Sequence, residues 1–225
     1  MIQDSYKNLF SEHFLFWSHL SSAEQSEFLR NIEPARYKKG DHIHNGSGHC
    51  LGVMFVKSGH VRVYMLSDEG REITLYRLFD GDTCIFSASC VLKEITFDVF
   101  IDAEDDTEVL LIKPSYYDDL SQKNIYVKNF TLSLTQKRFS DVMWAMQQIL
   151  FMSFDKRLAT FLLTEIEKSG VDKIKLTHEQ IAKYMGSARE VVSRMLKYFE
   201  SDGLVELSRG GIKVIDKSGL KDIAN

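Results

Sequence analysis

Residues 177–199 have the sequence THEQIAKYMGSAREVVSRMLKYF, and this stretch decides the fold of the C-terminal part of the chain. Thr177 and Gln180 have the spacing of a capping box, which opens a short helix with an apolar inner face. Gly186 supplies a sharp turn after that helix, and a second helix begins at once. The sequence therefore predicts two short helices joined by a glycine turn.

The second helix has two chemically different faces. Ser187 is its expected N-cap, and apolar residues follow the spacing of a buried face. At about 100° per residue, polar groups occupy the opposite face. The apolar residues are Val192, Met195, Leu196 and Phe199, and the polar ones are Arg189, Glu190, Ser193, Arg194 and Lys197.

The polar face has the chemistry of a helix that enters the DNA major groove. Arginine can donate two hydrogen bonds to guanine, a carboxylate can accept one from cytosine, and Ser or Lys can hold phosphates. For single residues a local explanation stays open, in which Glu190 completes the cap of Ser187 and Arg194 pairs with Glu190.

The segments around the two helices extend this prediction. Residues 205–215 are expected to form two strands around a Gly-Gly turn, a wing that places Arg209 and Lys213 near backbone phosphate. An amphipathic helix is expected over residues 156–168. Residues 154–225 hold 13 basic and 11 acidic side chains, so the negative net charge of −4 comes from the rest of the chain.

A long helix is predicted over residues 124–152, which contain neither proline nor glycine. A helix of about 28 residues spans about 42 Å, more than most small domains need, so part of its apolar seam is expected to meet a partner helix in a homodimer. The alternative is a helix packed wholly on its own β domain. The seam has coiled-coil spacing and consists of Ile125, Leu132, Phe139, Val142, Met146 and Ile149.

Residues 35–112 have a different sequence pattern, in which short runs rich in β-forming residues are separated by glycine-containing turns. Such spacing predicts an antiparallel sandwich or barrel. A capping box at Ser21 and Glu24 predicts a short helix before it.

Several function classes are excluded or disfavoured by the bulk properties of the 225 residues. No apolar run approaches the ~18 residues of a membrane span, and the start of the chain does not resemble a signal peptide, so we expect a cytoplasmic protein without membrane contact. We find no Walker loop, nucleophile elbow or HExxH motif, and therefore no enzyme is expected. The three cysteines form no C-x-x-C pair, and we expect reduced thiols.

Residues 186–196 resemble the recognition-helix signature of the Crp/Fnr regulators of bacteria. In that family a Glu-x-x-Ser-Arg run recognises a TGA core in each half-site, which implies base contacts by Glu190 and Arg194. Ser193 resembles the fumarate-nitrate branch and Arg189 the catabolite-activator branch. Residues 57–64, 68–73 and 79–82 are similar to the family's cyclic-nucleotide-binding-like domain. The resemblance implies double-stranded DNA, a second copy of the chain and RNA polymerase as partners.

The sequence departs from the family's cyclic-nucleotide members at the phosphate cassette. Ile85-Phe86 stands where those members have Gly-Glu, and Ile95-Thr96 where they have Arg-Ser. Because a phosphate buried without a cation costs several kcal/mol, we expect neither cAMP nor cGMP. Two interpretations stay open, a pocket for an apolar effector and a filled core. The residues concerned are Ile85, Phe86, Ile95 and Phe97.

Cys50, Cys84 and Cys90 are candidate redox-sensing or metal-sensing thiols, against the alternative that they are small buried hydrophobes. The spacing identifies no metal site and no cofactor. Residues 1–49 contain no cysteine, so the iron-sulfur cluster of oxygen-sensing relatives is not expected.

These observations predict an α+β protein with three parts. An antiparallel β jelly-roll (double-stranded β-helix) sensor covers residues 1–112, a dimerisation helix and linker 113–152, and a winged helix-turn-helix 153–225. The expected function is transcription regulation by a homodimer on palindromic sites, in response to a signal other than cAMP. The alternative is a cyclic-nucleotide-type regulatory module without DNA function.

Overall fold

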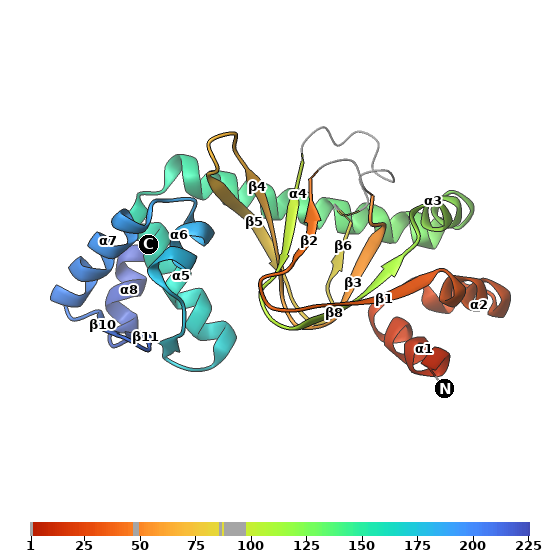
Figure 1. The fold of residues 1–225 in the computed structure, drawn as a ribbon, viewed down its shortest axis with the longest axis horizontal. Helices are drawn as coiled ribbons and strands as arrows, with labels where there is room; N and C mark the ends of the chain where they lie inside the picture. Colours follow the sequence, from red (N-terminus) through yellow and green to blue (C-terminus); the bar gives the residue numbers. More distant parts are fainter. Residues whose placement is uncertain (1, 47–49, 86, 88–97) are drawn as a thin grey trace. The chain divides into compact units, whose positions relative to one another are not determined.

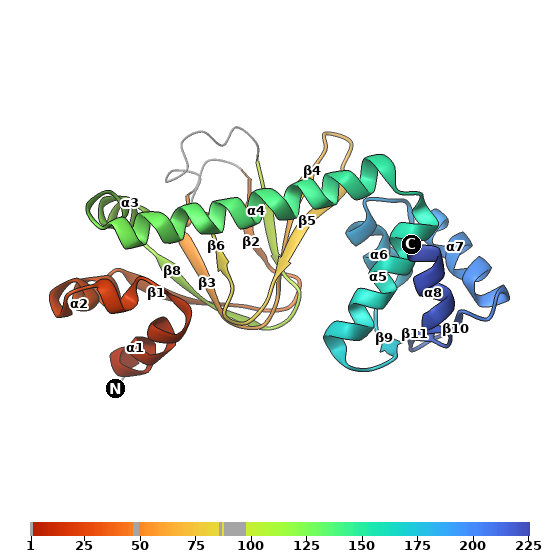
Figure 2. The same ribbon diagram turned by 180° about the vertical axis from the view of Figure 1, so that it is seen from behind.

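The computed structural model describes residues 2–46, 50–85, 87 and 98–225. The chain forms two compact units. The first contains residues 1–65 and 75–142, and the second contains residues 66–74 and 143–225. Figures 1 and 2 show the course of the chain from opposite sides.

The first unit is built on two four-stranded antiparallel sheets that face each other (Figure 1). The strand orders are β1-β8-β3-β6 and β2-β7-β4-β5. With the long helix and the C-terminal helix-turn-helix, this arrangement confirms the predicted α+β class. The strands are β1 (Ile32–Tyr37), β2 (His42–Asn45), β3 (Val53–Ser58), β4 (Val61–Leu66), β5 (Glu72–Leu78), β6 (Thr83–Cys84), β7 (Phe100–Ala103) and β8 (Thr107–Ile112).

An aromatic cluster joins the N-terminal helices to the first sheet. The Phe10 and Phe14 rings lie 5.0 Å apart, and the Phe14 ring lies 5.5 Å from that of Phe55 on β3. The predicted capping box of Ser21 and Glu24 is confirmed at the start of α2. The helices before β1 are α1 (Ile2–His13), the 3-10 helix η1 (Trp17–His19) and α2 (Ser22–Arg30).

The space between the sheets is filled by apolar side chains, among them Ile85 and Cys84, both fully buried. The other three residues of the expected effector pocket, Phe86, Ile95 and Phe97, lie outside the described residues. The choice between an effector pocket and a filled core therefore remains a prediction.

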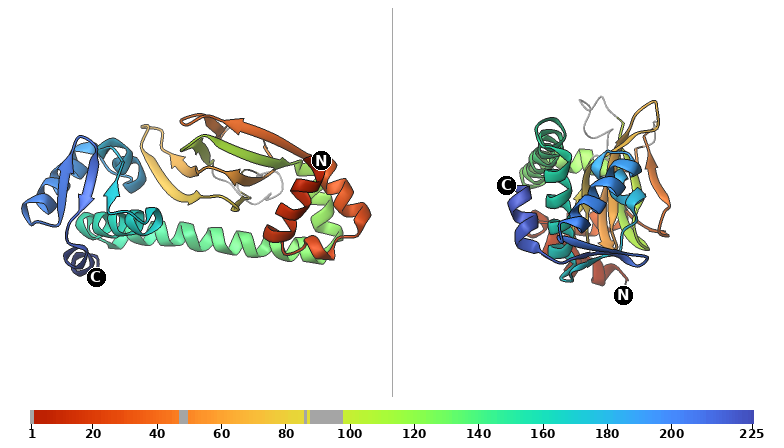
Figure 3. Two further views of the ribbon diagram at one scale, coloured as in Figure 1. Left: turned by 90° about the horizontal axis from the view of Figure 1, so that it is seen from below. Right: turned by 90° about the vertical axis from the view of Figure 1, so that its left-hand side faces the viewer.

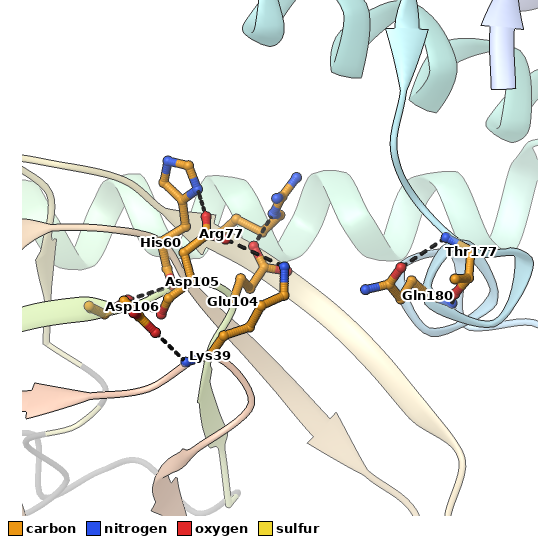
Figure 4. A network of polar contacts seen from close by, with 9 residues as sticks. Lys39, His60, Arg77, Glu104, Asp105, Asp106, Thr177 and Gln180 are labelled. Carbon is orange, nitrogen blue, oxygen red and sulfur yellow. Dashed lines mark hydrogen bonds and ion pairs between the residues drawn. The ribbon is translucent and has the colours of Figure 1, made fainter. Parts of the chain in front are cut away.

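One end of the sandwich is held by ion pairs (Figure 4). Arg77 donates to Glu104 at 2.6 Å, and both side chains are largely buried. His60 Nδ1 lies 2.8 Å from an Asp105 oxygen, and the Lys39 ammonium lies 3.5 Å from the same carboxylate. These contacts tie together the loops that join the strands at this end.

The cysteines differ in state. Cys84 is a free, buried thiol, Cys50 is disulfide-bonded, and Cys90 lies outside the described residues. The expectation of reduced thiols is therefore wrong for Cys50, because spacing along a sequence cannot reveal a bond made through the fold. Within the described residues, no three His, Cys, Asp or Glu side chains gather as a metal site.

After α3 (Pro114–Lys123), the long helix α4 (Ile125–Phe151) runs without interruption (Figure 2). This confirms the long helix predicted over residues 124–152. Two of its side chains are buried, Val127 and Arg138. The Arg138 guanidinium lies 4.7 Å from the centre of the Tyr76 ring and donates to the Thr83 carbonyl at 3.1 Å. No helix in the described parts of the chain is both long and apolar enough to cross a membrane.

Most of the predicted seam on α4 is exposed. Ile125, Leu132, Phe139 and Met146 are each at least half exposed. Val142 instead packs against the core between the sheets, and Ile149 is half-buried. Among the described residues of the first unit, no segment buries Ile125, Leu132 or Phe139.

The second unit has its own hydrophobic core, to which α5, α6, α7, the small sheet and α8 all contribute. Figure 3 shows these elements gathered together. The sheet has the order β10-β11-β9, so a short strand that the sequence did not indicate joins the two strands of the wing. The elements are α5 (Phe154–Ser169), β9 (Lys173–Ile174), α6 (His178–Met185), α7 (Arg189–Ser201), β10 (Val205–Ser208), β11 (Gly211–Val214) and α8 (Lys217–Ala224).

Candidate nucleic-acid interface

Helix α6 begins with the predicted capping box. The Thr177 hydroxyl accepts a hydrogen bond of 3.1 Å from the backbone nitrogen of Gln180, and the backbone nitrogen of Thr177 donates one of 2.8 Å to Gln180 Oε1 (Figure 4). These two bonds satisfy amides that a helix start otherwise leaves without a partner. The start of the helix-turn-helix is thereby fixed by local sequence.

The turn between α6 and α7 depends on Gly186. Its φ of 58° and ψ of 42° lie in the left-handed region, where a side chain is disfavoured. The amide nitrogen of Ser187 then donates to the Ala182 carbonyl at 2.9 Å and closes the end of α6. A helix ending of this kind is common and turns the chain sharply.

The predicted N-cap of the second helix is wrong. The N-cap is Ala188, which has extended backbone angles and no side-chain cap, and α7 begins at Arg189. Ser187 lies one position earlier, in the turn, where its backbone amide donates to the Ala182 carbonyl. Glu190 is therefore the second residue of α7 and does not complete a capping box.

The inner face of α7 is buried as predicted. Val192, Leu196 and Phe199 are fully buried in the core of the second unit, and Met195 packs against it. Because this face is fixed against α5 and α6, the opposite face is presented at a defined angle.

Five polar side chains line a single surface hollow of about 440 Å³ on the other face of α7. Five of the seven predicted DNA-contacting residues are thus brought together by the structure, and their contact with DNA stays a prediction. Arg194 and Glu190 form no ion pair in the described part of the chain, so the local pairing considered from sequence is not made. The lining residues are Arg189, Glu190, Ser193, Arg194 and Lys197.

The remaining two predicted residues lie elsewhere. Ser187 is half-buried in the turn, and Arg209 lies at the exposed tip of the wing. Val205–Ser208 pairs with Gly211–Val214, which confirms the predicted hairpin around Gly210. Arg209 lines a second hollow, formed between the wing and the start of α6.

His178 was missed by sequence reasoning. It is the first residue of α6, and its Nδ1 lies 2.8 Å from Ser193 Oγ on α7. Partial burial, together with the charges of Arg189 and Lys197, lowers the pKa of His178 below its usual value. Its place directly after the N-cap Thr177 was visible in the sequence, but its contact with α7 was not.

Arg157 supports the turn from behind. It extends from α5 and donates to the Met185 carbonyl at 3.0 Å, one of the carbonyls that the end of α6 leaves without a helical partner. Burial lowers its pKa, with a further contribution from Arg71. A charged donor thus anchors the last turn of α6 to α5.

Comparison with known proteins identifies the family. Residues 156–223 match the model of the Crp-like helix-turn-helix domain. The crystal structure of a transcriptional regulator of the Crp/Fnr family from Eubacterium rectale is 47% identical to this chain, with a TM-score of 0.90, and the match covers 95% of this chain and 99% of that one. The chain belongs to the Crp/Fnr family. It is a transcription regulator with a helix-turn-helix DNA-binding domain.

More distant Crp/Fnr relatives agree over most of the chain. The cyclic AMP receptor protein of Thermus thermophilus is 27% identical over 205 residues, which are 91% of this chain and 94% of that protein. FixK2 from Bradyrhizobium japonicum is 21% identical, with a TM-score of 0.69 over 86% of this chain and 98% of that one, and shares the fold.

Proposed function

We propose that this Crp/Fnr regulator binds palindromic DNA sites with TGA-containing arms as a homodimer. The observation that carries the proposal is the hollow on α7, where two arginines, a lysine, a serine and a carboxylate share one exposed face. This face has the donors and acceptors that base edges in the major groove require. The helix lies in the second unit, whose fold is that of a DNA-binding domain.

The base contacts are assigned to Glu190 and Arg194. Arg194 can donate two hydrogen bonds to guanine O6 and N7, and Glu190 can accept one from cytosine N4. Both side chains are exposed and neither is tied to the other, so each is available to DNA. Ser187, Ser193, Arg189 and Lys197 are assigned to further contacts with this groove and its phosphates.

Phosphate contact from the wing is assigned to Arg209, with Lys213 as its neighbour on β11. Both are exposed and have no ion pair in the described residues. Such contacts fix the orientation of a protein on DNA without carrying sequence information.

The homodimer is proposed to form along α4. Large apolar side chains on this helix are exposed. Four of them, Ile125, Leu132, Phe139 and Met146, recur every seven residues, a spacing that suits a second copy of the same helix. In the dimer, two α7 helices about 34 Å apart enter successive major grooves. The exposed residues are Ile125, Tyr126, Leu132, Phe139, Met143, Trp144, Met146, Leu150 and Phe151.

The first part of the chain is proposed to sense a signal other than cAMP, because Ile85-Phe86 and Ile95-Thr96 replace the polar cassette of cyclic-nucleotide members. We assign residues 1–112 to the sensor, 113–152 to dimerisation and 153–225 to DNA binding. An apolar effector near Ile85 and a thiol-based signal at the cysteines remain the two candidate inputs. Action on DNA implies a cytoplasmic location and RNA polymerase as a further partner.

The test is the affinity of the purified full chain for a palindromic TGA duplex and for a scrambled duplex, measured by fluorescence anisotropy at two salt concentrations. We expect the wild type to prefer the palindrome, and Arg194→Ala to lose about 1 to 3 kcal/mol of that preference, the value of one bidentate base contact. Lys221→Ala, which removes one exposed charge from α8, is the matched control. Equal binding of all duplexes would favour a regulatory module without DNA function.

A further inference from the structure

The bond between His178 and Ser193 joins the two helices of the helix-turn-helix at its outer surface. Ser193 lines the hollow on α7, whereas His178 lines the hollow beside the wing. Nδ1 and Oγ are 2.8 Å apart, a good hydrogen-bond distance, and both residues are half-buried. The serine of the proposed DNA-binding surface is therefore already engaged before DNA arrives.

The direction of this hydrogen bond depends on whether Nδ1 of the imidazole carries a hydrogen. A serine hydroxyl has one hydrogen to donate and two lone pairs. In the neutral imidazole that carries its hydrogen on Nε2, Nδ1 accepts the hydroxyl hydrogen, and Ser193 offers only lone pairs to DNA. When His178 is protonated, Nδ1 donates, and the hydroxyl hydrogen of Ser193 becomes free.

The two states of Ser193 suit different bases. A hydroxyl that can only accept fits the amino groups of adenine and cytosine, whereas a hydroxyl that donates fits guanine O6 and N7 or thymine O4. We propose that His178 is a positioning residue which, through Ser193, makes the base preference of α7 depend on its own protonation. This inference rests on the proposed binding of DNA by α7.

The charges around His178 determine how its protonation responds to DNA. Arg189 and Lys197 face it from α7, and Lys175 and Arg209 line the same hollow from the segment before α6 and from the wing. Partial burial, together with the charges of Arg189 and Lys197, keeps the pKa of His178 below its usual value in the free protein. DNA phosphates placed among them favour the protonated imidazole, and the pKa rises in the complex.

The sign of the pH effect follows from linkage. Since the proton is held more tightly in the complex than in the free protein, DNA binding takes up a proton. Affinity for the palindromic TGA-containing site, called the operator from here on, therefore increases as the pH falls through the pKa of His178 in the complex. It levels off below the pKa of His178 in the free protein.

The experiment measures operator affinity of the full chain from about pH 5.5 to 8 at constant ionic strength, a range that brackets the usual histidine pKa. The duplexes carry each of the four base pairs at every position of one arm. The proteins are the wild type, His178→Gln, Ser193→Ala and the double variant. His42→Gln is the control, because His42 is an exposed histidine paired with Asp102 in the first unit.

We expect one arm position at which the wild-type preference changes with pH by about threefold to tenfold, the value of one hydrogen bond. The change is lost in both single variants, the double variant shows no additional loss, and His42→Gln behaves as wild type. This inference alone is overturned if the wild type distinguishes the operator from scrambled DNA but His178→Gln shows the same pH profile as the wild type. A wild type that does not distinguish them overturns the proposed function as well.

A second measurement does not depend on variants that must fold. The His178 ring signal of the wild type is titrated by NMR with and without the operator duplex. We expect a pKa below the usual histidine value in the free protein and a higher one in the complex. Equal values in the two states would contradict the inference.

Discussion

Arg138 donates a hydrogen bond of 2.8 Å to the carboxylate of Asp141, one turn further along α4. The arginine side chain is only 3% exposed, whereas that of Asp141 is 33% exposed. A buried guanidinium needs such a partner, because an isolated charge in an apolar core is very costly. The contact with the Thr83 carbonyl and the Tyr76 ring connects α4 to β6 and β5.

We expect Arg138→Met to lower the free energy of unfolding by about 1 to 3 kcal/mol. The variant loses the charged hydrogen bond to Asp141 and leaves the Thr83 carbonyl without its donor. Urea unfolding followed by circular dichroism measures the change. Lys137→Met is the matched control, because Lys137 is the preceding residue, is 60% exposed and lies 3.8 Å from Asp82, a pair worth at most about 1 kcal/mol. A loss for Lys137→Met as large as that for Arg138→Met would show that the burial of Arg138 is not the cause.

We expect Leu132→Glu and Phe139→Glu to dissociate the proposed dimer, because each places a charge on the exposed apolar seam of α4. Sedimentation velocity measures the oligomeric state, and affinity for the full palindrome should fall in parallel. Gln147→Glu changes an exposed polar residue of the same helix by one charge and serves as the control. Variants that remain dimeric at the concentrations where the wild type is dimeric would exclude this seam as the interface.

Gly186→Ala tests whether the turn positions α7. A left-handed alanine costs about 1 kcal/mol. Gly170→Ala introduces the same strain after α5, at a φ of 67° and with no neighbour within 4 Å of the added Cβ, and is therefore a matched control for stability. We expect both variants to lose similar stability, but only Gly186→Ala to weaken operator binding. Equal DNA affinity of the two variants would contradict a positioning role for the turn.

Arg209→Ala is expected to weaken binding to all duplexes alike, because a phosphate contact carries no sequence information. The slope of log K against log salt concentration should become shallower by about 0.9, the contribution of one phosphate contact. Arg30→Ala, at an exposed arginine of α2 paired with Glu27, is expected to leave the slope unchanged. A loss of sequence preference without a change in slope would instead assign Arg209 to a base.

The parts of the fold that local periodicity determines were predictable from sequence. The inward and outward faces of α7 follow from helical spacing, and the ends of α4 were predicted to within one residue. The capping boxes at Ser21 and Thr177 are local hydrogen-bond patterns and were also predicted. In each case the determining contacts join residues that are close in sequence.

Features that depend on distant contacts were not predicted. Ser187 has the right chemistry for an N-cap, but it lies in the turn, where its backbone amide donates to the Ala182 carbonyl, and the N-cap of α7 is Ala188. Helix α1 is held by aromatic contacts with β3, as between Phe10 and Phe55. The bond between His178 and Ser193 spans 15 residues and exists only because α6 and α7 pack together.

The uncovered apolar seam of α4 has a consequence for gene control. If two chains must meet before a palindrome can be occupied, then below the dimer dissociation constant, and while most of the operator is empty, the bound fraction of operator grows with the square of the amount of chain. A twofold change in synthesis of the regulator then produces about a fourfold change in occupancy, by this mass-action argument alone. The abundance of the protein thereby becomes an input in its own right, additional to any effector.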